Sequence, residues 1–122
     1  MKRIIAVFTG NRAEYGLQYP VLKAIESNAD LDYRLIVSGA HLDKDFGQTI
    51  QEIQKDGFTA HKIIEIDLDE SKPNAISHAI GTGVLSISKA LSEIKPDIFL
   101  IYADRFEGFA AVIASSQMNI PT

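Results

Sequence analysis

The sequence predicts an α/β fold built on a doubly wound, parallel β-sheet. Four short apolar runs rich in β-branched and aromatic residues alternate with longer segments of helical periodicity. Such alternation favours parallel strands that are covered by helices on both faces. The length of 122 residues, with 46% hydrophobic and 23% charged residues, is typical of one globular domain. We therefore expect a single domain over residues 1–122.

The four expected strands are apolar runs of strand length that are bounded by Gly, Pro or Asp. They span Arg3 to Thr9, Tyr33 to Ser38, Lys62 to Leu68 and Ile98 to Tyr102. The segments between them carry apolar residues at spacings of three and four, as amphipathic helices do. The faces expected to be buried are, in chain order, Leu17, Val21, Leu22 and Ile25; Phe46, Ile50 and Ile53; Ile76, Ile80, Val84, Ile87, Leu91 and Ile94; and Phe106, Phe109, Ala110 and Ile113.

Prolines and glycines refine these expected helices. Pro20 should lie near the start of the first helix, where its missing N–H is tolerated, and Pro96 should end the third. Gly81 and Gly83 lie inside the third helical pattern, where each glycine costs about 1 kcal/mol relative to alanine. We expect close packing or a close ligand approach at these two glycines.

The connections predict how the strands are ordered. Because crossovers between parallel strands are right-handed, the common doubly wound order is 3-2-1-4, with a crevice between strands 1 and 4, where the chain reverses direction. Residues 9–16 and 102–108 would border that crevice at the carboxyl ends of these strands. We therefore expect two loops that are far apart in the sequence to be neighbours in space.

The two loops share a pattern that is typical of helix caps. Asn11 and Asp104 are each followed three residues later by an acid, Glu14 and Glu107 respectively. In a capping box the first side chain accepts an N–H of the first turn, and the acid reaches back to the cap. The pattern can therefore be purely structural.

An arginine follows the expected cap in each loop. At that position Arg12 and Arg105 oppose the helix dipole, which costs about 0.3 to 1 kcal/mol at low salt. Two such cations beside one crevice predict that a phosphorylated ligand is held between two helix N-termini. Asp104, beside Arg105, should be ionised and could act as a general base. A solvated or salt-bridged arginine is the alternative at both positions.

Histidines supply one further candidate for the site. His41 follows the second expected strand in the segment "SGAHL" and would lie near the crevice, able to donate a hydrogen bond. A surface histidine in a loop is the alternative. His61 and His78 show no ligand-like spacing to each other or to His41, so we expect no metal site.

Charge and composition exclude several classes of protein. The net charge of −4 provides no overall basic field for nucleic acid or an anionic membrane, so an anion site must be local. The absence of cysteine excludes disulfides and thiolate sites. Asn11 and Arg12 follow the first apolar run too soon for a signal peptide, and no stretch approaches the ~20 apolar residues of a membrane span. We expect a soluble, cytoplasmic protein without a cofactor.

Four motifs in register resemble one enzyme family, the hydrolysing UDP-N-acetylglucosamine 2-epimerases. They are "TGNRAEYG", "VSGAHL", "KPDIFLIYADRFEG" and "MNIP", and the similarity runs through the whole chain. Two departures from the family pattern are Ala103, where glycine is usual, and Leu17, where the related non-hydrolysing epimerases have lysine. The second departure favours the hydrolysing branch.

The resemblance implies a Rossmann-like domain that forms the amino-terminal half of a glycosyltransferase-B type fold. Such enzymes bind a UDP-N-acetylhexosamine between two domains, eliminate UDP to leave a 2-acetamidoglucal, and add water to release an N-acetylmannosamine-type sugar for sialic or legionaminic acid synthesis. Asp104 matches the aspartate of the acid/base chemistry. The residues expected to bind substrate are Arg12, Glu14, His41, Arg105 and Glu107.

The resemblance also implies that residues are missing. A second catalytic glutamate and the carboxyl-terminal domain, which would hold most of the UDP, are not in this sequence. We therefore expect a fragment that is inactive alone and that forms a homo-oligomer when full length. The alternatives are a glycosyltransferase half-domain, a phospho-accepting receiver or a non-catalytic nucleotide-binding module. The receiver is disfavoured because the first loop, "GNRAE", lacks adjacent acids.

Overall fold

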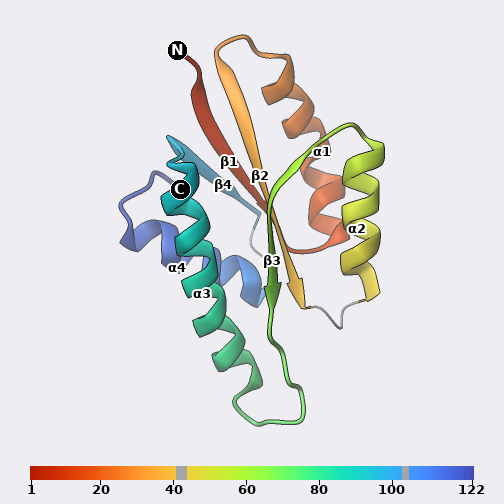
Figure 1. Ribbon diagram of the computed structural model, residues 1–122, viewed down its shortest axis with the longest axis vertical. Coiled ribbons are helices and arrows are strands. Elements are labelled where there is room, and N and C mark those ends of the chain that lie inside the picture. The colour runs from red at the N-terminus through yellow and green to blue at the C-terminus, as the bar shows by residue number, and fades with distance from the viewer. Residues whose placement is uncertain (41–43, 103–104) are drawn as a thin grey trace.

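The computed structural model of the chain describes residues 1–40, 44–102 and 105–122, and it has the expected alternation of strand and helix (Figure 1). The elements are β1 (Arg3–Thr9), α1 (Arg12–Ser27), β2 (Leu31–Ala40), α2 (Lys44–Lys55), β3 (Ala60–Ile66), α3 (Ala75–Ile94), β4 (Ile98–Ile101) and α4 (Phe106–Gln117). Within the described ranges, no helix is both long and apolar enough to cross a membrane.

All four strands are parallel and lie in the order β3-β2-β1-β4, which confirms the predicted topology. The central strand β1 pairs with β2 from Arg3↔Leu31 onward and with β4 from Ile5↔Ile98 onward. Because β1 and β4 are adjacent and parallel, the chain leaves both of them at the same edge of the sheet.

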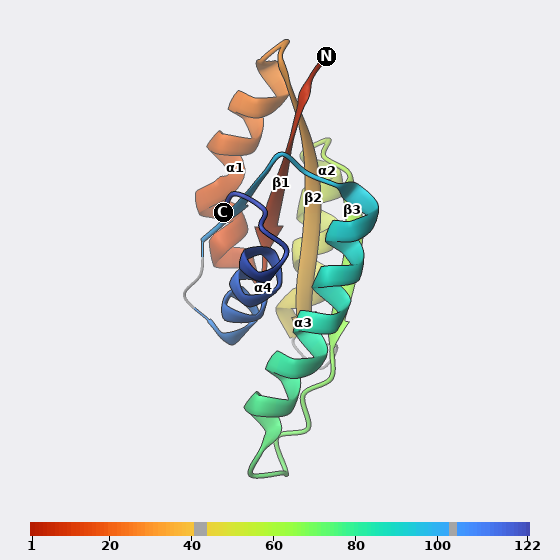
Figure 2. The ribbon, with the colours of Figure 1, turned by 90° about the vertical axis from the view of Figure 1, so that its left-hand side faces the viewer.

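Helices cover both faces of the sheet, α1 and α2 on one side and α3 and α4 on the other (Figures 1 and 2). Alternate residues of β1 serve the two cores: Ile5 and Val7 face α1 and α2, whereas Ala6 and Phe8 face α3 and α4. The first core also contains Tyr15, Leu22, Ile25, Leu35, Val37, Ile53 and Phe58. The second also contains Ile36, Ile64, Ile66, Ala79, Ile87, Ala90, Leu91, Phe99, Ala110, Ala111 and Ala114.

The prediction of which α1 residues are buried was partly wrong. Leu17 is 60% exposed and Val21 41% exposed, while Leu22 and Ile25 are buried as predicted. The helix starts at Arg12, directly after the expected cap Asn11, but its inner face runs through Glu14, Tyr15 and Gln18 to Leu22 and Ile25, and therefore includes polar residues that the apolar pattern did not mark. Pro20 was expected near the start of this helix, but it lies in the middle of α1.

Two further apolar residues also lie outside the cores against expectation. Ile76 is 47% exposed and Phe109 is 58% exposed, so the inner faces of α3 and α4 are narrower than the apolar pattern predicted. The two helices pack closely against each other at Gly83. A Cβ on Gly83 would lie 3.2 Å from the Cβ of Ala110, whereas a Cβ on Gly81 would have nothing within 4 Å. Close packing is thus confirmed at Gly83.

Candidate active site

The loop after β1 is closed by its own hydrogen bonds. The Asn11 side chain caps α1, because its Oδ1 accepts a hydrogen bond from the Glu14 N–H at 2.9 Å. The Glu14 carboxylate reaches back and accepts the Gly10 N–H at 2.8 Å. Glu14 is only 1% exposed. The predicted capping box is therefore present, with the acid bonded to the residue before the cap.

Gln18, which the sequence did not single out, fastens α1 to the end of β1. Its Nε2 donates a 2.7 Å hydrogen bond to the carbonyl oxygen of Phe8, and the residue is 4% exposed. Because Gln18 lies one turn after Glu14 on α1, the two side chains together fix the first turn of the helix beneath the loop. A polar residue at a buried helical spacing is the signal that could have indicated this role.

Arg12 extends from the first turn of α1 to α2. Its guanidinium contacts the Glu52 carboxylate, with both Nε and a terminal nitrogen 2.7 Å from Oε1. The two side chains are 58% and 38% exposed. This ion pair is the alternative interpretation of Arg12 that the sequence left open. The substrate contact expected of Arg12 stays a prediction, since a ligand would have to compete with Glu52.

A second link between α1 and the end of α2 is buried more deeply. The Tyr15 hydroxyl donates a 2.7 Å hydrogen bond to Oδ2 of Asp56. Burial, followed by this bond to a carboxylate, raises the pKa of Tyr15 well above its usual value. The phenol therefore stays protonated and holds the two helices together.

The loop after β4 begins its helix differently from the expected capping box. The N-cap of α4 is Arg105, whose side chain makes no capping hydrogen bond, and the helix starts at Phe106. Arg105 thus occupies the cap position and not the position after it. Its guanidinium lies 3.2 Å from Oε1 of Glu107 and 5.7 Å from the centre of the Phe106 ring. Glu107 is 1% exposed.

The two loops meet at Gly10. A Cβ on Gly10 would lie 3.4 Å from Oε2 of Glu14 and 3.5 Å from the Cβ of Glu107. This contact confirms that the loops after β1 and β4 are neighbours. The two buried glutamates flank Gly10, and their carboxylates lie in the first turns of two helices, where negative charge is favoured.

The other expected site residues are His41, Asp104, Glu14 and Glu107. His41 and Asp104 lie outside the described residues, so their predicted roles stay predictions. Glu14 and Glu107 are too deeply buried for a ligand to contact them unless the loops open. Among the described residues no group of three or more His, Cys, Asp or Glu side chains could hold a metal ion.

A pocket of about 540 Å³ opens at the carboxyl edge of the sheet, between the first turns of α2 and α4. Figure 1 shows both turns beside the ends of β2 and β3. Residues from four segments line the pocket: Ala40, Lys44, Asp45, Leu68, Asp69, Glu70 and Arg105. Arg105 therefore belongs both to the contact of the two loops and to this pocket. No local sequence signal could have brought Lys44 and Glu70 together, because the pocket arises only from the topology.

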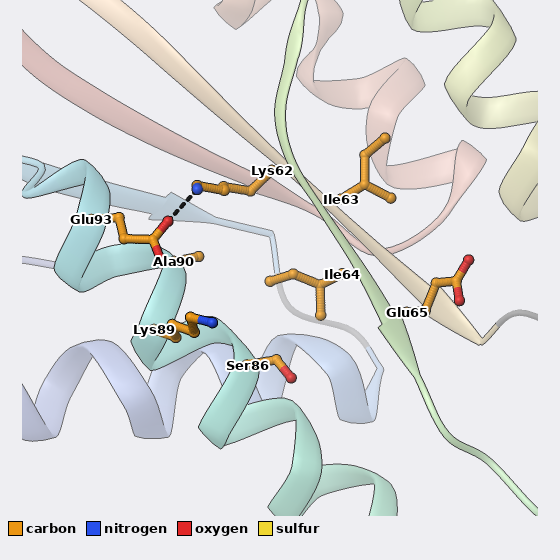
Figure 3. Close-up of a pocket in the computed structure, with 8 residues that line it drawn as sticks. All are labelled: Lys62, Ile63, Ile64, Glu65, Ser86, Lys89, Ala90 and Glu93. Atoms are coloured by element: carbon orange, nitrogen blue, oxygen red, sulfur yellow. Dashed lines mark hydrogen bonds and ion pairs between the residues drawn. The ribbon is translucent and has the colours of Figure 1, made fainter.

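A second, shallower hollow of about 310 Å³ lies between β3 and α3, away from these loops (Figure 3). The Lys62 ammonium reaches across it to the Glu93 carboxylate and forms an ion pair. None of the residues predicted for the substrate lines this hollow. It therefore serves as a reference region outside the candidate site.

Comparison with known proteins identifies the family. The family model described as UDP-N-acetylglucosamine 2-epimerase matches residues 23–122. The chain belongs to this epimerase family. The hydrolysing UDP-N,N'-diacetylbacillosamine 2-epimerase of Legionella pneumophila is 39% identical over 121 residues, which cover 99% of this chain and 32% of the relative. Polysialic acid biosynthesis protein P7 of Escherichia coli is 33% identical, over 99% of this chain and 31% of its own length.

Solved structures of the epimerase family share the fold. UDP-GlcNAc 2-epimerase from Neisseria meningitidis, bound to UDP-GlcNAc, superposes with a TM-score of 0.79 at 22% identity and covers 98% of this chain and 30% of that one. The S. aureus MnaA–UDP co-structure gives 0.80 at 21% identity, over 99% and 30% of the two chains. The α/β fold is thus the Rossmann-like fold found in these glycosyltransferase-B type epimerases, and the chain spans about a third of the length of its curated relatives.

Proposed function

We propose that this chain forms the amino-terminal part of a hydrolysing UDP-N-acetylhexosamine 2-epimerase. The observation that carries the proposal is the contact of the two loops at Gly10, where a Cβ would lie 3.5 Å from Glu107. A base on the loop after β4 can then act on a ligand that is bound at the loop after β1. Family membership and the sequence relatives support the same reaction.

The proposed reaction is an elimination of UDP followed by an addition of water. Asp104 takes the proton from C2 of the sugar while the bond between C1 and the UDP oxygen breaks, and the electron pair of the C2–H bond forms the C1=C2 double bond. Water then adds its hydroxyl to C1, and a proton returns to C2 on the opposite face. The C2 proton of a sugar is not acidic, so its removal has to be coupled to departure of the stabilised diphosphate and to a positioned base.

Arg12, Arg105 and His41 are proposed to bind the nucleotide sugar. Arg12 can exchange Glu52 for a diphosphate at small cost, because an exposed ion pair contributes only about 0 to 1 kcal/mol. Glu14 and Glu107 are proposed to support substrate binding indirectly, because they hold the two loops in place. The sugar is proposed to be N-acetylglucosamine or a deoxy-diacetamido relative, as the names of the relatives suggest.

We further propose that these residues are inactive alone and need additional chain, in a homo-oligomer, to complete the uridine diphosphate site. The chain covers only 32% and 31% of the length of its two relatives, which supports the proposal. The edge of β4 that faces away from β1 supports it too. The Phe99 N–H on that edge already donates a 2.8 Å hydrogen bond to the Pro121 carbonyl, as it would to a fifth parallel strand.

The decisive experiment uses the full-length protein with Asp104→Asn. Released UDP and free sugar are measured from UDP-N-acetylglucosamine and its diacetamido relative, in D2O. The wild type should release UDP and a 2-epimer that carries deuterium at C2. The variant should be slower by about 10²-fold or more, the usual contribution of a general base.

Asp30→Asn is the control, since Asp30 is an exposed aspartate in the turn before β2, and it should leave the rate unchanged. UDP release that Asp104→Asn does not slow would remove Asp104 from the reaction. Sugar transfer to an acceptor without free 2-epimer would favour a glycosyltransferase.

A further inference from the structure

The pocket between α2, the β3–α3 connection and Arg105 contains residues to which the proposed reaction assigns no role, Lys44 and Glu70 among them. We propose that it binds the acetamido group on C2 of the sugar, with Lys44 donating to the acetamido carbonyl and Glu70 accepting from its N–H. The inference rests on the proposed function, because it deepens how that site selects its substrate. It names three residues, Lys44, Leu68 and Glu70, as determinants of specificity.

Charge argues against a phosphate in this pocket. Three carboxylates line it, on Asp45, Asp69 and Glu70, against two cations, on Lys44 and Arg105. The Lys72 ammonium lies 3.9 Å from Oδ2 of Asp69, so the charges around the pocket balance and a diphosphate would find no net positive charge there. A neutral ligand that both donates and accepts hydrogen bonds suits this balance. The pocket of about 540 Å³ is also within the range that holds small molecules.

The apolar residues that line the pocket fit the methyl group of the acetamido substituent. Leu68 and Ala40 are the apolar residues of the pocket, and Leu68 packs partly against the core between the sheet and α3 and α4. An amide N–H, a carbonyl and a methyl group thus each find a matching side chain. A hydroxyl in the place of the acetamido group can still make one of these hydrogen bonds, but it has no methyl group to cover the apolar surface.

Glu70 is the acceptor in this assignment because Asp69 is already engaged. Oδ1 of Asp69 accepts hydrogen bonds from the Ser71 N–H at 3.1 Å and from the Ser71 hydroxyl at 2.6 Å. These bonds fix the turn that presents Glu70. Glu70 itself is exposed, at the same edge of the sheet as Lys44.

The pocket also lies where the chemistry requires it. C2 carries both the proton that the base removes and the acetamido group. Arg105, which borders the pocket, directly follows Asp104 in the sequence. A base that reaches C2 from this loop therefore places the acetamido group beside Arg105.

The test measures binding of UDP-N-acetylglucosamine, UDP-glucose and UDP to the full-length protein by calorimetry. UDP-glucose carries a hydroxyl in place of the acetamido group. The wild type should prefer UDP-N-acetylglucosamine, and Lys44→Met and Glu70→Met should each reduce that preference about fivefold, as loss of one hydrogen bond predicts. Affinity for UDP should not change.

Matched controls come from the hollow in Figure 3, where Lys89→Met and Glu65→Met should leave the preference intact. An unchanged preference in Lys44→Met and Glu70→Met would overturn the assignment, even while the wild type releases UDP and so satisfies the proposed function. A parallel loss of all three ligands would overturn it in favour of a diphosphate site. Failure of the wild type to bind either nucleotide sugar would contradict both the proposed function and the proposed acetamido site.

Discussion

The loops after β1 and β4 carry the same spacing of residue types, yet they begin their helices differently. In the first, Asn11 caps α1, and the helix starts with Arg12. In the second, Arg105 takes the cap position without a capping hydrogen bond, and α4 starts at Phe106. The cation of the first loop extends to Glu52 on a neighbouring helix, whereas the cation of the second lies against Glu107 of its own helix.

The difference lies in where the two loops direct their arginines. The first loop satisfies its N–H groups with Asn11 and Glu14, and its arginine extends toward the outer surface of α2. The second loop places Arg105 on the wall of the carboxyl-edge pocket. A shared sequence pattern therefore does not imply a shared role, because the position of the cap decides where the arginine points.

The largest effect is expected when the acid that closes the first loop, Glu14, is removed. Glu14→Ala should lower the free energy of unfolding by about 2 to 3 kcal/mol, because it leaves the buried Gly10 N–H without its charged acceptor. Glu14→Gln keeps an oxygen acceptor and should lose less than half as much. Urea denaturation of the 122-residue chain measures both variants. Equal losses would mean that charge, and not the hydrogen bond, closes the loop.

The second prediction tests whether the second loop depends on the packing of α3 and α4. Gly81→Ala should stabilise the chain by about 1 kcal/mol through helix propensity alone. Gly83→Ala gains the same propensity but forces its Cβ to within 3.2 Å of Ala110. Its stability should therefore lie about 2 kcal/mol below that of Gly81→Ala.

Amide chemical shifts localise the effect of this pair of variants. In Gly83→Ala the first turn of α4, around Glu107, should shift, while Gly10 and Asn11 should shift little. Equal shifts in both loops would show that the loops move as one unit and would remove the distinction between them.

The third prediction concerns the cap of α1. Asn11→Ala should cost about 1 kcal/mol, because Asn11 accepts the Glu14 N–H. Asn74 is the matched control, since it occupies the N-cap of α3 without a capping hydrogen bond. Asn74→Ala should change stability by no more than about 0.5 kcal/mol. A comparable loss at both asparagines would show that the cap bond of Asn11 is not what fixes the first loop.

Much of the fold could be predicted from the sequence because local patterns determine it. The first strand has the expected bounds, Arg3–Thr9, since one apolar run ends at a glycine. The strand order followed from the handedness of crossovers, and that order brought the two loops together. The capping box at Asn11 and Glu14 is likewise local.

The rest depended on partners that are distant in the sequence. The ion pair of Arg12 requires Glu52, and the two residues are 40 positions apart. His61, which had no expected role, accepts the Leu35 N–H at Nδ1 at 3.1 Å, where the register of β2 and β3 shifts. Burial and nearby Arg34 lower the pKa of His61 and keep it neutral for that bond. No local signal encodes such contacts.

The smallest expected effect belongs to the ion pair of the first loop. A double-mutant cycle with Arg12→Ala and Glu52→Ala should give a coupling of about 0.2 to 1 kcal/mol, because both side chains are substantially exposed. The coupling should fall further in 1 M salt, which screens exposed charges. A coupling well above 1 kcal/mol that resists salt would mean that Arg12 is held on α2, and the proposed exchange of Glu52 for a diphosphate would fail.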